Sequence, residues 1–226
     1  MATYSNSEAT KTALIMAAGE LFVEQGTKAV TTRAIAKKAG ENIGSIKYHF
    51  GSKDGLLDAV IDYATRHWCS DPLGHYLKDN EHLFRTREGQ ARLVTGFIDN
   101  FLGRAFSKDR PPWCGMLIFQ LMQRDIPASK KIFESSVSPV QNAFCSLYAR
   151  IAGDNDEEMA ICWMLTTAAP AHLLSADPQT FKKIHRVNTV PESLLQKVRN
   201  MIIKSALVNL GLFRYCECGQ RPGGQA

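Results

Sequence analysis

A short segment from Lys28 to Lys53 concentrates side chains that can bind phosphate groups and the polar edges of nucleic-acid bases. It contains six basic residues, which are Lys28, Arg33, Lys37, Lys38, Lys47 and Lys53. Its acidic residue is Glu41, so the segment carries a charge of +5, equal to the formal net charge of the whole chain. Such a concentration of positive charge favours a polyanionic partner. A solvated basic face without a partner is the alternative interpretation.

Small or polar side chains stand where a short helix would begin inside this segment. They are Asn42, Gly44, Ser45 and Lys47. Small residues allow a helix backbone to approach a DNA groove closely, while asparagine and lysine can hydrogen-bond bases or phosphates. Arg33 and Lys53 are among the cations that could surround such a contact. The pattern predicts a segment that binds in the major groove of DNA.

The spacing of apolar residues predicts the helices that position this segment. A first helix over 7–25 has a stripe formed by Leu14, Ala17, Ala18, Leu21 and Phe22. Thr31 and Thr32 offer an N-cap for a short helix that Gly40 ends, and a second short helix follows over 43–50. This order predicts a helix-turn-helix, in which the second helix reads base edges. The alternative interpretation of these two short helices is a helical hairpin within an ordinary helical bundle.

The rest of the chain is also predicted to be helical. A turn over 51–55 leads into a fourth helix, and the polar stretch over 70–87 is the expected domain junction. Longer helices are expected over 88–106, 113–124, 132–151, 157–174 and 191–212. Pro139 and Pro170 lie inside two of these ranges and predict a kink or break.

Composition and cysteine usage limit the function classes. The 226 residues are 45% hydrophobic and 22% charged, and the sequence shows neither a secretion signal nor a bilayer-length apolar stretch. The six cysteines are mostly scattered singly, which suits a reduced, cytoplasmic protein. The Cys216 and Cys218 pair is interpreted as part of a flexible tail over 215–226, with a metal site as the alternative. The sequence shows no catalytic pattern or cofactor motif, so the protein is not expected to be an enzyme.

The motifs of residues 8–68 resemble the TetR family of bacterial transcriptional regulators. They are the TTRAIAKKAG run from Thr31, the IKYHF run from Ile46 and the SKDGLL run from Ser52. The resemblance implies an all-α homodimer with a helix-turn-helix domain over 8–68. It also implies a C-terminal dimerisation and inducer-binding domain over 69–214.

The resemblance assigns roles to individual residues of the DNA-binding segment. Thr32 matches a position that contacts phosphate, and Lys53 matches the lysine that anchors phosphate at the start of the fourth helix. Lys47 stands where most members have tyrosine, and the aromatic Tyr48 follows it. His49 fits the family pattern, with packing or a phosphate-facing role. The complete set expected to bind DNA is Thr31, Thr32, Arg33, Asn42, Gly44, Ser45, Lys47, Tyr48, His49 and Lys53.

A narrower resemblance, to the CecR-type subgroup, extends into the C-terminal half. It rests on the AGENIGSIKYHFGSKDGLL run and on PPWCGMLIFQLMQRDIPAS and VSPVQNAF further along. It implies control of transport or drug-sensitivity genes.

Two further surfaces are expected in the C-terminal half. Dimerisation through the last two long helices would use Trp163, Leu165, His172, Leu194, Met201 and Ile202, unless these faces close the core of one chain. A small apolar or amphipathic inducer would bind among Trp113, Met116, Phe119, Gln120, Phe133, Phe144, Tyr148 and His172, unless these residues only pack the core.

The sequence thus predicts a regulator that binds a palindromic operator as a homodimer, most simply a repressor released by an inducer. It is expected to need no cofactor, metal or membrane. The alternative is a protein of the same fold that acts through a protein partner without operator binding. Glu41, Ile43 and Lys47 keep this alternative open, because they are unusual near DNA.

Overall fold

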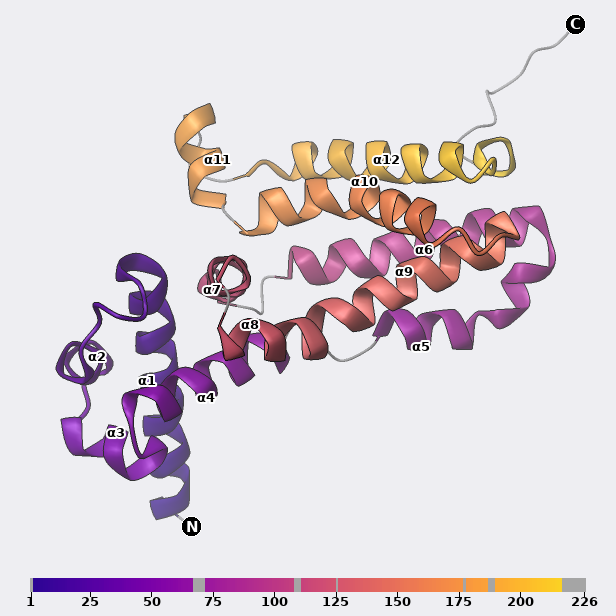
Figure 1. The fold of residues 1–226 in the computed structure, drawn as a ribbon. Coiled ribbons are helices and arrows are strands. Elements are labelled where there is room, and N and C mark those ends of the chain that lie inside the picture. Colours follow the sequence, from indigo (N-terminus) through magenta and orange to yellow (C-terminus); the bar gives the residue numbers. More distant parts are fainter. Residues whose placement is uncertain are drawn as a thin grey trace, which may run out of the picture. The chain divides into compact units, whose positions relative to one another are not determined.

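The computed structural model describes residues 2–66, 72–107, 111–124, 126–176, 178–186 and 190–216. All regular secondary structure in these segments is helical (Figure 1), as the sequence predicts. None of the described helices is long and apolar enough to cross a membrane. The chain forms two compact units, and each contains two separate stretches of sequence. The first unit comprises 1–70 and 109–136, and the second comprises 71–108 and 137–226.

The first unit is built on α1, whose predicted apolar stripe is buried. Its helices are α1 (Ala2–Gln25), α2 (Thr32–Ala39), α3 (Ile43–Phe50), α4 (Lys53–Arg66), α7 (Trp113–Met122) and α8 (Pro127–Ile132). All five residues of the stripe are in the core, and Phe22 is completely buried. Helix α7 packs against α1 and α4, where the ring of Trp113 lies directly against Gly19. A salt bridge of 2.6 Å between Lys131 and Asp62 joins the segment after α7 to α4.

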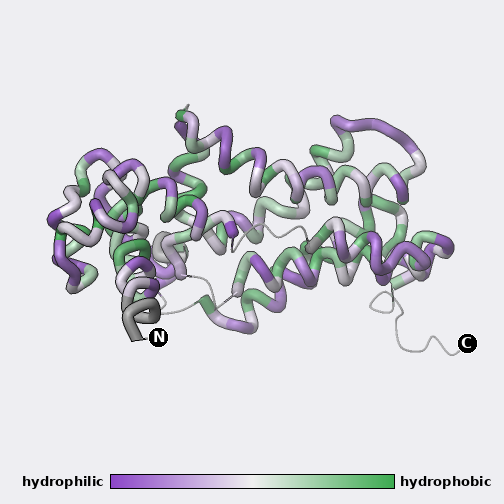
Figure 2. The backbone as a smooth tube through the Cα atoms, turned by 90° about the horizontal axis from the view of Figure 1, so that it is seen from below, coloured by the Kyte–Doolittle hydropathy of each residue, from purple (hydrophilic) through white to green (hydrophobic). Residues whose placement is uncertain are grey.

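The second unit has its own core. Its helices are α5 (Pro72–Asp79), η1 (Glu81–Arg85), α6 (Arg87–Ala105), α9 (Ser138–Ala152), α10 (Glu157–Ala176), α11 (Pro178–His185), α12 (Glu192–Asn209) and η3 (Phe213–Tyr215). Phe144 of α9 lies edge-on to Phe97 of α6, with ring centroids 4.9 Å apart. Arg199 of α12 forms a two-pronged ion pair with Asp99 of α6, with both contacts at 2.6 Å. Apolar and polar stretches alternate along the helices of each unit (Figure 2), as expected of amphipathic helices.

The structure corrects the predicted division of the chain. The expected boundary near residue 68 agrees with the end of the first stretch, but residues 109–136 also belong to the first unit rather than to a domain over 69–214. The reason is packing, because the apolar face of α7 is covered by α1 and α4. The predicted junction over 70–87 is also wrong in part, since α5 and η1 occupy most of it.

Other sequence predictions have mixed outcomes. The predicted break near Pro139 is confirmed, because a π-helical turn over Phe133–Val137 precedes α9. Pro170, by contrast, lies within the continuous helix α10. Cys145 and Cys162 are free thiols, as expected, whereas Cys216 is disulfide-bonded, which the expectation of reduced cysteines did not include. Cys218 and most of the expected tail lie outside the described residues.

Candidate nucleic-acid interface

Side-chain caps fix the helix before the turn. The Thr31 hydroxyl accepts a hydrogen bond of 3.2 Å from the Ala34 amide and caps α2. Gly40 ends α2 with φ of 70°, a left-handed conformation that glycine adopts without strain. Ile35 and Ala36 bury the inner face of α2. The predicted N-cap and C-terminal glycine are therefore confirmed, and they fix where the turn to α3 begins.

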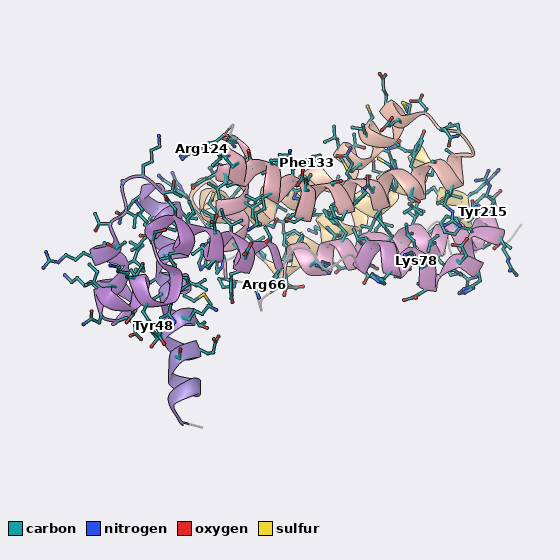
Figure 3. The ribbon with its side chains drawn as sticks, turned by 60° about the horizontal axis from the view of Figure 1, so that its bottom comes forward. Tyr48, Arg66, Lys78, Arg124, Phe133 and Tyr215 are labelled. Atoms are coloured by element: carbon teal, nitrogen blue, oxygen red, sulfur yellow. The ribbon has the colours of Figure 1, made fainter. Side chains whose placement is uncertain are left out.

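Helix α3 buries one side and exposes the other. The Asn42 side-chain oxygen accepts a hydrogen bond of 2.8 Å from the Gly44 amide, so the helix begins at Ile43. Ile46 is buried, whereas Ile43, Gly44, Lys47 and Tyr48 are exposed. Tyr48, which Figure 3 labels, is 82% exposed. We call the four exposed residues the α3 face. It shares Gly44 and Lys47 with the small and polar set expected from the sequence, whereas Ser45 is half-buried.

The other basic residues of the helix-turn-helix segment differ in their exposure and contacts. Lys28, Arg33 and Lys37 are exposed. Lys53 is half-buried, and its ammonium group donates a hydrogen bond of 3.3 Å to the carbonyl of Lys28, which ties the start of α4 to the loop before α2. Lys38 instead forms a 2.9 Å salt bridge with Glu20, and its pKa is raised above the ordinary value mainly by that hydrogen bond. The positive charge of Lys38 is thus partly neutralised by Glu20 of α1.

Glu41, the acidic residue of the segment, has a partner on α1. Its carboxylate accepts a hydrogen bond of 3.0 Å from the Thr10 hydroxyl in a part-buried position. This contact orients the carboxylate toward α1, so the acidic residue that seemed to conflict with DNA binding has a structural role. The partner is 31 residues away in sequence, and no local pattern pointed to it.

The turn between α3 and α4 depends on a glycine that sequence reasoning did not single out. A Cβ atom on Gly55 would lie 2.2 Å from the carbonyl oxygen of Phe50. Ser52 accepts a hydrogen bond of 3.0 Å from the Gly55 amide and so caps the start of α4. Gly55 therefore allows the end of α3 to lie against the first turn of α4. The glycine-flanked turn over 51–55 was the available sequence signal.

The remaining expected DNA contacts occupy the ends of these helices. Thr32 is the first residue of α2 and is half-buried, and Ser45 is half-buried in α3. His49 is also half-buried, with its ring 4.9 Å from that of Tyr48. The oxygens of Thr31 and Asn42 already accept capping hydrogen bonds, which leaves their hydrogen-bond donors for other partners.

The residues expected to form an inducer pocket are divided between the two units. Trp113, Met116, Phe119, Gln120 and Phe133 belong to the first unit, and Phe144, Tyr148 and His172 belong to the second. Gln120 donates a hydrogen bond of 3.3 Å to the Val23 carbonyl, and the ring of His172 contacts Phe101 at 5.6 Å. Phe144 and Tyr148 are buried in the core of the second unit, while Phe133 is exposed (Figure 3). Within their own units, Gln120, Phe144, Tyr148 and His172 thus make contacts typical of residues that pack helices together.

The expected dimerisation residues have contrasting environments. Trp163 and Ile202 are buried, and the Trp163 indole donates a 3.4 Å hydrogen bond to the Ala206 carbonyl. Leu194 is half-buried and His172 is exposed. Leu165 is 56% exposed and Met201 is 72% exposed. The exposed members lie on α10 and α12, which pack side by side (Figure 1).

Comparisons with known proteins agree with this arrangement. The family model for bacterial regulatory proteins of the tetR family matches residues 14–60. The model for the C-terminal domain of the HTH-type transcriptional dual regulator CecR matches residues 91–203, half of the chain. The chain is 41% identical to the dual regulator CecR of Shigella flexneri over 133 residues, which are 58% of this chain and 53% of that protein. It is 36% identical to the transcriptional repressor KstR2 of Rhodococcus jostii over 72 residues, 32% of this chain and 33% of that protein.

Solved structures show the same fold at low sequence identity. A TetR-like transcriptional regulator from Rhodococcus sp. RHA1 superimposes with a TM-score of 0.57 at 18% identity, covering 89% of this chain and 96% of that chain. A transcriptional regulator from Aquifex aeolicus gives a TM-score of 0.54 at 16% identity, covering 88% of this chain and 98% of that chain.

The described residues thus have an all-helical fold with a helix-turn-helix segment, and the chain belongs to the TetR family of bacterial regulatory proteins. Within that family, its C-terminal part is of the CecR type. The chain spans between about a quarter and about half of the length of the curated relatives it matches.

Proposed function

We propose that this regulator binds a specific operator in duplex DNA through the α3 face. The observation that carries the proposal is the division of α3 into a buried side at Ile46 and an exposed side that includes Lys47, within a segment that carries further exposed cations. Since the capped helix begins at Ile43, its first residues are the ones available to base edges in a major groove. Lys47, one turn along, can donate to a guanine edge or to a phosphate.

Phosphate contacts would hold the helix in register. Lys53 keeps two ammonium hydrogens for phosphate after its bond to the Lys28 carbonyl. Thr32 sits at the start of α2, where backbone amides and a hydroxyl favour an anion. Such contacts fix the position of the protein on the duplex without reading the base sequence, whereas the α3 face would discriminate between base sequences.

The regulator would bind DNA as a homodimer formed through α10 and α12. Leu165 and Leu173 on α10, with Met201 and Val208 on α12, expose large apolar side chains on two helices that pack together. The spacing of seven between Met201 and Val208 places them on one side of α12. A second copy would remove this apolar surface from water. Two chains would then present two α3 faces to a two-fold symmetric operator.

A small apolar or amphipathic inducer would release the DNA, making the regulator a repressor. Differential binding worth only about 1.4 kcal/mol lowers operator affinity tenfold, so a modest preference for one dimer conformation is sufficient. The name of KstR2 includes repressor, whereas that of CecR includes dual regulator. Repression is the simpler of these modes for an operator-binding dimer.

Selection of bound duplexes from a random library, followed by titration of the enriched duplex and a scrambled control, tests operator binding. We expect a two-fold symmetric consensus and at least about a thousandfold preference over the scrambled duplex at physiological salt. Absence of enrichment, or equal affinity for the enriched and the scrambled duplex, would instead support the alternative in which the protein acts through a protein partner. Glu41, one of the three residues behind that alternative, has its carboxylate bonded to Thr10 of α1.

A further inference from the structure

An aliphatic side chain is exposed at the start of α3, where the packing of the first unit does not require it. Ile43 is 51% exposed and is not part of the core that buries Ile46 three residues later. A branched aliphatic side chain in water gains nothing from its exposure, because burial of apolar surface is what stabilises it. The exposed part of Ile43 is therefore available to a binding partner.

The surroundings of Ile43 favour DNA over a second copy of this surface. Lys28, Arg33, Lys37 and Lys47 are all exposed in the same helix-turn-helix segment. Two such cationic surfaces would repel each other, whereas the phosphates of a duplex would be attracted. The nearby acidic residue, Glu41, has its carboxylate bonded to Thr10. The charge thus favours a polyanion as the occupant.

The local geometry places Ile43 toward base edges. Asn42 caps the helix, so Ile43 is its first residue, and the N-terminal residues of a recognition helix are the ones that reach into the groove. Gly44 follows with no side chain, and a Cβ atom there would meet only the Asn42 oxygen at 3.3 Å. Lys47, four residues later, lies on the same side of the helix. An apolar group and a cation therefore occupy successive turns of one face.

We infer that Ile43 is a specificity-determining residue that recognises the 5-methyl group of a thymine in each half-site. In the major groove, thymine differs from the other bases in presenting a methyl group, which an aliphatic side chain recognises by apolar contact. Ile43 has no donor or acceptor, so it cannot read the polar edge of any base. This inference rests on the proposed operator binding and adds to it the chemistry that one side chain reads.

The test removes methyl groups from the DNA one position at a time. On the duplex enriched by the full chain, each thymine is replaced by deoxyuridine, which lacks only that methyl group, and affinity is measured by fluorescence anisotropy. We expect one symmetry-related pair of positions at which deoxyuridine weakens binding by about fourfold per half-site, the factor expected for one buried methyl group. Ile43→Ala is expected to bind both forms equally, and Ile43→Val to keep part of the discrimination.

Thermal unfolding of the Ile43 variants serves as the control, and we expect it to match the parent because the side chain is outside the core. The inference is overturned if no thymine position is sensitive to methyl loss, or if Ile43→Ala discriminates as strongly as the parent. In both of those cases the enriched duplex is still bound, so operator binding survives. Failure to enrich any duplex overturns operator binding and this inference together.

Discussion

The α2–α3 pair and the α10–α12 pair expose opposite chemistry. The two helices of the first pair have eight residues each, end at defined caps and expose cations. In the second pair, α10 has 20 residues and α12 has 18, and both expose large apolar side chains such as Leu173 and Met201. The cationic surface of α2 and α3 would repel a second copy of itself, so it is unfavourable for dimerisation. The apolar surface of α10 and α12 would gain little from contact with phosphate, so it is unfavourable for DNA binding. The contrast is the one that the proposed roles require, with one surface for DNA and one for a second chain.

The strongest way to break this comparison is to place a charge on the apolar surface. We expect Met201→Asp to convert the dimer to monomers, because a dimer interface would then bury an unpaired carboxylate. Operator affinity should fall by about a thousandfold, toward the affinity for unrelated DNA. Analytical ultracentrifugation and anisotropy measure the two effects.

Ser146→Asp provides the matched control for Met201→Asp. Ser146 is exposed on α9 rather than on α10 or α12. This variant should remain a dimer and bind the operator as the parent does. If Met201→Asp also remains a dimer, the assignment of the apolar surface is incorrect.

The second prediction concerns the turn that holds α3 against α4. Gly55→Ala should lower the free energy of unfolding of the first unit by about 1–3 kcal/mol, because its Cβ would clash with the Phe50 carbonyl. Gly103→Ala is the control, since a Cβ at this exposed position in α6 meets nothing within 4 Å. It should stabilise the second unit by up to about 1 kcal/mol. Equal thermal stability of the two variants would contradict the clash.

A third prediction separates phosphate anchoring from sequence reading. Lys53→Ala should weaken binding to the enriched and the scrambled duplex by the same factor, because phosphate is common to both. The slope of log affinity against log salt should fall by about 0.9 for each lysine removed from a phosphate. A loss confined to the enriched duplex would show that Lys53 reads bases instead.

The smallest effect is expected from an exposed ion pair in the second unit. The Arg150 guanidinium hydrogen-bonds Glu81 and lowers the pKa of that carboxyl below its ordinary value. Because the folded pKa is depressed, the stabilisation is present above about pH 4.5 and is lost as the pH falls through the folded pKa. Thermal unfolding from pH 6 to pH 3 should therefore show a slightly smaller acid-dependent loss in Glu81→Gln. An identical pH dependence in both proteins would contradict a stabilising pair.

Parts of the molecule differ in how much of their structure the sequence predicted. The bounds of α2 and α3 were predictable because their caps, Thr31 and Asn42 among them, lie next to the helices they begin. The placement of 109–136 in the first unit was not, because the apolar residues of α7 indicate burial without indicating that α1 and α4 cover them. Helices α5 and α11 were missed because short, polar segments have weak helical periodicity.

Within the candidate site, too, the sequence predicted features that depend on local residues and missed contacts that depend on tertiary structure. Gly44 and Lys47 of the α3 face were evident from composition and spacing. The bond from Thr10 to Glu41 and the close approach of Phe50 to Gly55 depend on tertiary structure, and local sequence does not encode the approach of those groups.

Charge reversal at two lysines tests the central claim, that the α3 face reads the operator, most directly. Lys47 is exposed on α3, and Lys78, which Figure 3 labels, is exposed on α5 of the second unit, so Lys47→Glu and Lys78→Glu change the net charge equally. Affinity for the enriched duplex is measured at one salt concentration. We predict a loss of about a hundredfold or more for Lys47→Glu and less than about threefold for Lys78→Glu. Equal losses in the two variants, or full affinity in Lys47→Glu, would contradict the claim.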